Sequence, residues 1–451
     1  MFAPWKIVHI ELSQGIPELP FYYGIQGACV VFWWHGIPLG EQKIQVDHLP
    51  MPAFQLRQLA TKAITPAVGD HLVNHGFKAR LPMPPSIRLF DKPPDLQTLM
   101  ALDQPLRRLR RHLSQPRDGL PCLSVSVVVC TRDRPEHLVL CLRSLEKLSE
   151  RPYEILVIDN APTSDATRCL VSETPEVRYI LEPRPGLSIA RNKGIENSSA
   201  DVIAFTDDDV MVHPDWITRL RQSFQSPAVM AVTGLVLPAE LETEAQFLFQ
   251  QGNEPSKWGY RALTFDSDFF ELMKSRGVPV WRIGAGANMA FRRKIFDIVG
   301  DFDERLGAGA AGCSEDSELW YRVLAQGWLC RYEPTAVVYH YHRKELSDLE
   351  HQIYHYMRGH MAALLIQFDK YRHWGNLYRA FGVLPWYYTK LFRKSLRNLM
   401  PGPKSQAGTL GAQIRGCLAG VKYYLQNRSC SSRFGASADK ADWSEQEYIS
   451  K

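Results

Sequence analysis

Short apolar runs alternate with helical patterns in the middle of the chain. Residues 124–130 (SVSVVVC), 154–158 (EILVI) and 202–206 (VIAFT) have the composition of strands buried on both faces of a sheet. Residues 135–148 repeat apolar positions at helical spacing, and residues 188–197 predict a further helix. This alternation predicts an α/β fold with a mostly parallel central sheet and right-handed crossovers.

The segments on either side have different patterns. Strand-like runs at residues 7–12 and 28–34, with a turn at 36–40, indicate a small β-rich unit. After about residue 345 the chain becomes helical, aromatic and basic, and its final part is polar and predicts little order. We therefore expect a small β-rich N-terminal domain at 1–80, a Pro/Arg-rich linker at 81–121, an α/β domain at 122–345, a C-terminal helical, basic-aromatic region at 346–400 and a polar tail at 401–451.

Composition narrows the classes of protein to consider. The chain has 451 residues, more than one hydrophobic core usually spans, and its net charge of +5 gives no indication of nucleic-acid binding. Nine cysteines without a CxxC pair favour reduced thiols in a cytoplasmic protein over a disulfide framework. We see no signal peptide and no apolar run long enough to span a membrane.

Polar residues follow three of the predicted strands, and ligands of such sheets bind beyond the carboxyl ends of the strands. These residues are Thr131–Asp133, Asp159–Asn160 and Asp207–Asp209. On an extended strand end, Asp207 and Asp209 converge while Asp208 faces elsewhere, and two converging carboxylates favour a divalent cation such as Mg²⁺ or Mn²⁺. The alternative is a solvated loop or a helix cap, but the position directly after a buried strand favours the metal site.

Seven motifs then occur in an order that resembles family-2 glycosyltransferases. The resemblance covers about residues 123–345 and implies a GT-A fold that binds a nucleotide sugar. It also implies inverting transfer of a sugar to a hydroxyl of a glycan, lipid-linked or other acceptor, in polysaccharide or glycolipid synthesis. The motifs are VVVCTRDR at 127–134, ILVIDN at 155–160, GLSIARNKG at 186–194, FTDDD at 205–209, GAGANMAFR at 284–292, GDFDE at 300–304 and EDSEL at 315–319.

The resemblance assigns roles to individual residues. It implies Mn²⁺ or Mg²⁺ as the cofactor and Asp316 as the general base, with Glu315 beside it orienting the acceptor. The residues implied to bind the nucleotide sugar are Thr131, Arg132, Asp159, Arg191, Asp207 and Asp208. The implied metal ligands are Asp209 and Asp207, joined by a histidine that is either His340 or His342.

Elementary chemistry supports the base independently of the resemblance. An acceptor hydroxyl must lose its proton as it attacks, and a carboxylate within hydrogen-bond reach accepts that proton. The alternative for Glu315 and Asp316 is that they cap the helix that the following residues predict. The Gly-rich segment 307–313 (GAGAAGC) either closes over a bound sugar or forms tight turns.

Other functions stay open at this stage. A sugar-nucleotide nucleotidyltransferase would use a related sheet, but residues 131–135 (TRDRP) lack the glycine-rich loop expected after its first strand. A non-catalytic sugar- or partner-binding protein would use the same fold, although Asp209 and Asp316 are both present. The basic and aromatic residues at 374–399 predict either ordinary core helices or peripheral contact with anionic lipid at the inner face of the membrane.

Overall fold

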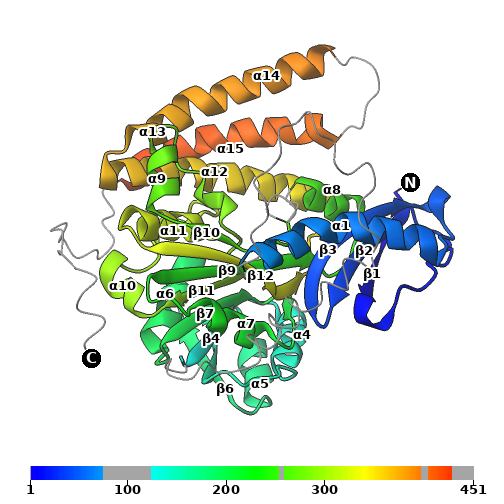
Figure 1. Ribbon diagram of the computed structural model, residues 1–451. Coiled ribbons are helices and arrows are strands. Elements are labelled where there is room, and N and C mark those ends of the chain that lie inside the picture. The colour runs from blue at the N-terminus through cyan, green and yellow to red at the C-terminus, as the bar shows by residue number, and fades with distance from the viewer. Residues whose placement is uncertain (1, 75–122, 253–258, 398–404, 429–451) are drawn as a thin grey trace.

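The computed structural model describes residues 2–74, 123–252, 259–397 and 405–428 (Figure 1). The linker expected at 81–121 lies outside these residues, as does the end of the expected polar tail beyond residue 428. The described chain contains a small three-stranded sheet near the N-terminus, a large mixed sheet with helices on both faces, and a layer of C-terminal helices.

The large sheet has nine strands, ordered β10-β12-β9-β11-β7-β4-β5-β6, with β8 paired to β12. Six of them run in one direction, as the sequence predicts, while β8, β10 and β11 run against their neighbours. The strands are β4 Val125–Thr131, β5 Glu154–Asn160, β6 Val177–Glu182, β7 Val202–Asp207, β8 Val210–Val212, β9 Val229–Pro238, β10 Leu263–Phe265, β11 Asn288–Arg292 and β12 Leu329–His340.

Both faces of this sheet are covered because its central strands carry apolar side chains on both sides. On β4, Val127 and Val129 pack on one face with α4 and α7, whereas Val128 and Cys130 pack on the other with α6, α10 and α11. The helices that occur between the strands of this sheet along the chain are α4 Pro135–Leu145, α5 Ala166–Ser172, α6 Leu187–Asn197, α7 Trp216–Ser223, α8 Glu244–Gly252, α9 Ser267–Lys274, α10 Lys294–Val299 and α11 Glu315–Ala325.

The N-terminal unit shares a hydrophobic core with the large sheet. It consists of β1 Trp5–Glu11, β2 Gly27–Trp34, β3 Ile37–Gln45 and helix α1 Ala53–Asn74. Its core includes Leu235 and Leu237 of β9 and Val337 of β12. The prediction of a turn at 36–40 was wrong beyond residue 36. Residues 37–40 belong to strand β3, in which Ile37 and Leu39 are buried. The long helix α1 was not predicted.

The C-terminal helices pack beside the sheet layer (Figure 1). They are α12 Leu346–Tyr371, α13 Trp374–Tyr378, a π-helical turn Arg379–Val383, α14 Leu384–Arg397 and α15 Ser405–Asn427. The expectation of a polar, loosely ordered tail was wrong for α15, which lies along α12. A Cβ at Gly416 or Gly420 would clash with the backbone oxygen of Tyr354 or Arg358, so these glycines permit the close approach. No helix in the described part of the chain is long and apolar enough to cross a bilayer.

Candidate active site

A cluster of two carboxylates and one imidazole lies at the carboxyl edge of the large sheet. Asp207 ends β7, and Asp209 lies in the turn between β7 and β8. The short strand β8 pairs with the end of β12, so Val210 lies opposite His340 and the Tyr341 N–H donates to the Asp209 carbonyl at 2.9 Å. This pairing is what carries His340 to the aspartates from a strand that is not a neighbour of β7.

The cluster has the donor atoms that a divalent cation requires. One ligand atom each from Asp207, Asp209 and His340 lies within 4.8 Å of the others. His340 Nε2 is 3.2 Å from Asp209 Oδ1. Although burial acts in the opposite direction on each pKa, the attraction between the two side chains lowers the pKa of Asp209 and raises the pKa of His340. Carboxylates with one imidazole suit Mn²⁺ and, with fewer protein ligands, Mg²⁺.

Asp208 is not part of this cluster, as expected, although it lies in the turn after β7 and not in the strand. Its carboxylate accepts a hydrogen bond from the Thr131 hydroxyl at 2.7 Å, and Arg134 Nη1 lies 3.2 Å from it. The same Arg134 nitrogen lies 3.1 Å from Asp209. Burial and the neighbouring Asp209 raise the pKa of Asp208 to about 6. Asp208 and Thr131 therefore fix the turn on which the two converging aspartates are presented.

Arg191 of α6 joins the aspartate cluster to a second pair of acids. It is 2% exposed, and its guanidinium lies 2.6 Å from Glu315 Oε1 and 3.2 Å from Asp207 Oδ1. A third contact reaches the Gly286 carbonyl at 3.4 Å, and the Phe302 ring lies under the guanidinium. A buried cation that bridges two carboxylates compensates charges that would otherwise be costly to bury.

Glu315 and Asp316 begin α11, directly after Ser314, whose φ is +71°. The Ser317 N–H donates to Asp316 Oδ1 at 2.6 Å, and both acids lie in the first turn of α11, whose N-cap is Ser314. The other Asp316 oxygen faces Gly286, where a Cβ would lie 3.1 Å away. Burial raises the pKa of both carboxyls, and the nearby Arg191 opposes the shift. A carboxylate with a raised pKa and one oxygen outside the capping bond is suited to accept a proton.

Asp159 lies at the end of β5, on the other side of β4 from Asp207. The Tyr179 hydroxyl donates to its Oδ2 at 2.9 Å, while its buried Oδ1 has no hydrogen-bond partner in the described residues. Glu315 Oε2 is a second buried oxygen that has no hydrogen-bond partner in the described residues. Arg132, by contrast, is half-exposed and its nearest acid, Asp133, is 3.9 Å away. Unsatisfied buried acceptors are costly, so both oxygens are suited to ligand hydroxyls or amines.

Comparison with known proteins identifies this part of the molecule. Residues 126–300 match the sequence model of the family described as Glycosyl transferase family 2. This segment belongs to glycosyltransferase family 2. The match covers β4 to β11 and includes Arg191, Asp207 and Asp209, whereas His340, Glu315 and Asp316 lie beyond it.

Curated relatives of the family-2 domain include three named proteins. The succinoglycan biosynthesis protein ExoM of Rhizobium meliloti is 30% identical over 48% of this chain and 66% of its own length. A glucosyl-dolichyl phosphate glucuronosyltransferase of Haloferax volcanii is 28% identical over 41% of this chain and 58% of its own. A pre-mycofactocin glycosyltransferase of Mycobacterium tuberculosis is 27% identical over 52% of this chain and 46% of its own length. The chain thus spans about half to two thirds of the length of these relatives.

Among solved structures, the mannosyltransferase PcManGT of Pyrobaculum calidifontis, in complex with GDP-Man and Mn²⁺, is similar to the chain. The TM-score is 0.47 at 15% identity, over 70% of this chain and 93% of that one. The GT-A fold expected of a family-2 domain agrees with the mixed sheet and with the acidic turn after β7.

The site also has features that the sequence did not reveal, some of them beyond the matched segment. Of the two candidate histidines, His340 reaches the carboxylates, whereas His342 lies behind it and its Nε2 faces Gln250 at 3.2 Å. Arg134, which bridges Asp208 and Asp209, was not predicted, because a lone arginine in a loop has no distinguishing pattern. The pairing of β8 with β12 was also missed, since a three-residue strand leaves no periodicity to detect.

Proposed function

We propose that the protein is a metal-dependent, inverting glycosyltransferase that uses a nucleoside-diphosphate sugar and an acceptor hydroxyl. The observation that carries this proposal is the bridge made by Arg191. One buried guanidinium contacts Asp207 of the cation cluster at 3.2 Å and Glu315, the neighbour of Asp316, at 2.6 Å. This contact supports a site in which one buried cation joins the cation site for the donor to the base for the acceptor.

On this proposal Asp207, Asp209 and His340 hold the divalent cation, which would neutralise the charge of the donor diphosphate. Arg134 lies 3.1 Å from Asp209 and adds positive charge at the same edge. Asp159 would accept a hydrogen bond from the nucleotide through its unsatisfied Oδ1. These roles divide the site into a nucleotide end at β5 and a cation centre at β7.

At the other end, Asp316 would act as general base. The acceptor oxygen attacks the anomeric carbon of the donor. The bond between that carbon and the diphosphate oxygen breaks, and the proton of the acceptor hydroxyl passes to Asp316. The nucleoside diphosphate leaves, and a single displacement inverts the anomeric configuration. Glu315, held by Arg191, would orient a sugar hydroxyl through its unsatisfied Oε2. The kinship with ExoM supports polysaccharide synthesis as the process served.

The test is calorimetric binding of UDP, dTDP and GDP, each with and without Mn²⁺, to the wild type and to Asp209→Asn. We expect one nucleotide to bind with metal dependence, and Asp209→Asn to abolish that dependence. Asp201→Asn is the matched control, since Asp201 pairs with Ser124 at the opposite end of the sheet. If none of the three nucleotides binds in either condition, the result contradicts the proposal and favours the non-catalytic alternative.

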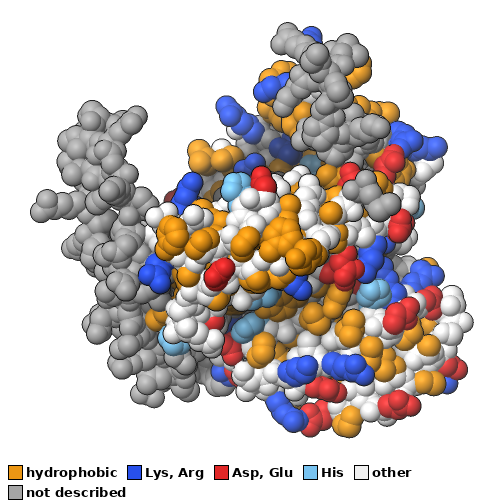
Figure 2. Space-filling model, turned by 90° about the vertical axis from the view of Figure 1, so that its right-hand side faces the viewer, with side chains coloured by type: hydrophobic (Ala, Val, Ile, Leu, Met, Phe, Trp, Pro, Cys, Tyr) orange, Lys and Arg blue, Asp and Glu red, His pale blue; other side chains and the backbone are white. Residues whose placement is uncertain are grey.

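We further propose that the C-terminal helices contact anionic lipid. α14 buries Leu384 and Tyr388 against its neighbours, yet Trp386 is 65% and Phe392 56% exposed on its outer side. Lys390 lies over the Trp386 ring at 5.4 Å. Figure 2 shows hydrophobic and basic side chains side by side at the top of the molecule, where α14 lies in Figure 1. Interleaved aromatic and basic residues are typical of helices that lie in a membrane interface.

Sedimentation with lipid vesicles tests this contact. We expect binding to vesicles containing phosphatidylglycerol and little binding to pure phosphatidylcholine, because basic residues add attraction to anionic lipid. The double variant Trp386→Ser with Phe392→Ser should weaken binding at least about tenfold. It removes two large rings that would be buried when the helix binds the membrane. The control replaces exposed Tyr23 and Tyr153, far from α14 in sequence, with Ser. Equal effects of the two double variants would disprove the proposal.

A further inference from the structure

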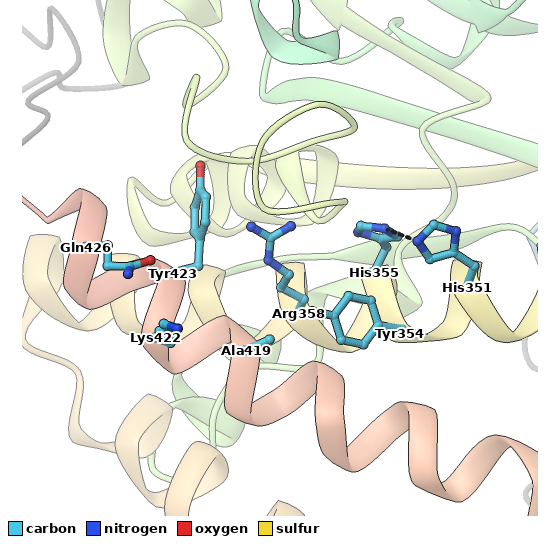
Figure 3. Close-up of a pocket in the computed structure, with 8 residues that line it drawn as sticks. All are labelled: His351, Tyr354, His355, Arg358, Ala419, Lys422, Tyr423 and Gln426. Carbon is cyan, nitrogen blue, oxygen red and sulfur yellow. Dashed lines mark hydrogen bonds between the residues drawn. The ribbon is translucent and has the colours of Figure 1, made fainter.

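A pocket of about 340 Å³ lies between α12 and α15, on elements outside the family-2 match. His351, His355 and Arg358 line it from α12, at spacings of four and three residues that place them on one face of the helix. Lys422 and Tyr423 line it from α15. Figure 3 shows the side chains of His355, Arg358 and Tyr423 on the same side of the two helices.

The lining is cationic and carries no acidic side chain among the described residues. Arg358 lies over the Tyr423 ring at 4.6 Å, and the exposed Lys422 adds a second permanent positive charge. His351 and His355 approach each other at 3.0 Å between their Nε2 atoms. Permanent cations gathered without a counter-charge repel each other, so a bound anion would stabilise Arg358 and Lys422 in this arrangement.

A single loop connects this pocket to the proposed base. Gly307 and Gly312 both have positive φ and are joined by a hydrogen bond from the Gly312 N–H to the Gly307 carbonyl at 2.8 Å. A Cβ at Gly307 would lie 3.4 Å from Glu315 Oε2, and one at Gly312 would lie 2.9 Å from His355 Nδ1. That His355 nitrogen is buried and has no hydrogen-bond partner among the described residues. One lining residue of the pocket therefore contacts the loop that leads to Glu315 and Asp316.

We propose that this pocket binds a phosphate ester group of the acceptor, so that the acceptor is an organic phosphate rather than a neutral glycan. The inference rests on the proposed transferase function, because it places the phosphate next to the loop that precedes Asp316. Arg358 and Lys422 would supply charge-assisted hydrogen bonds to the phosphate oxygens. Tyr354 and Tyr423 supply ring surfaces for the group that carries the phosphate.

Calorimetry with hexyl phosphate, inorganic phosphate and hexanol tests this proposal, in EDTA. Without metal the aspartate cluster repels anions, so binding reports the pocket. We expect hexyl phosphate to bind more tightly than inorganic phosphate, and hexanol not to bind. Arg358→Gln and Lys422→Gln should each weaken hexyl phosphate binding about tenfold, the size expected for one charge-assisted hydrogen bond.

Arg415→Gln is the matched control, because Arg415 is an exposed cation of α15 that pairs with Glu350 outside the pocket. It should change the affinity less than about twofold. Absence of hexyl phosphate binding, or an equal loss in Arg415→Gln, would overturn the proposal, as would equal affinity for inorganic phosphate. Nucleotide binding measured with Mn²⁺ on the same proteins keeps failure of the pocket distinct from failure of the transferase function.

Discussion

At the scale of single residues, Arg191 is the cation on which both halves of the site depend. Replacing it with Met leaves the buried Glu315 and the half-buried Asp207 without a bridging charge. Breaking a buried ion pair in this way costs roughly 3–5 kcal/mol, so we expect a lower free energy of unfolding and loss of metal-dependent nucleotide binding. Arg151→Met, at an exposed pair with Glu176, should cost no more than about 1 kcal/mol. Chemical denaturation of both variants measures the difference, and equal costs would contradict the bridging role.

Asp316 provides a second prediction at this scale. Burial raises the pKa of its carboxyl, and a base must be deprotonated to accept the acceptor proton. Activity is therefore lost as pH falls through the raised pKa, and the acid limb of kcat/KM should lie above the ordinary aspartate value of about 4. A pH–rate profile measures it. A limb at or below about pH 4 would show that a different group is titrating.

The sequence predicts some of these residues and not others, for physical reasons. The buried strand before Asp207 identifies the edge of the sheet, but Asp209 lies in the turn after β7, so its convergence with Asp207 depends on the turn rather than on the strand period. Choosing His340 over His342 requires the pairing of β8 with β12, which brings a distant strand to the turn. The bridge from Arg191 to Glu315 joins segments 124 residues apart and leaves no local pattern.

At the scale of elements, the packing of α15 on α12 makes a prediction with an internal control. A Cβ at Gly420 would clash with the Arg358 backbone oxygen, whereas one at Gly411 meets nothing within 4 Å. Gly420→Ala should destabilise the protein by roughly 1–3 kcal/mol through overpacking. Gly411→Ala should stabilise it by about 0.5–1 kcal/mol, because alanine is the better helix former. Thermal unfolding of the two variants compares them, and a shift of the same sign in both would refute the packing account.

The elements that the sequence predicted are those with a clear apolar pattern, such as β4, β5 and β7. Helix α15 was taken for part of a polar tail, because glycines at its contact with α12 leave gaps in the apolar pattern of Cys417, Val421 and Tyr424. The β3 residues at 37–40 were taken for a turn, because Pro38 and Gly40 outweighed the buried Ile37 and Leu39.

At the scale of the whole molecule, the N-terminal unit and the large sheet share one core. Leu235, Leu237 and Val337 are fully buried there and would be exposed without β2, β3 and α1. We therefore expect calorimetry of the full chain to give one unfolding transition for these two parts, and a chain beginning at residue 123 to unfold at lower temperature. An unchanged unfolding temperature in the shortened chain would mean that the N-terminal unit is an independent domain.

The central claim is that donor binding and proton removal are done by separate acids in one site. Asp316→Asn tests it most directly, with nucleotide affinity in Mn²⁺ and sugar transfer both measured on the same preparation. We predict affinity within about twofold of wild type and a loss of transfer of about 10²–10⁴-fold, the range for removal of a general base. Loss of nucleotide binding, or transfer at the wild-type rate, would contradict the account.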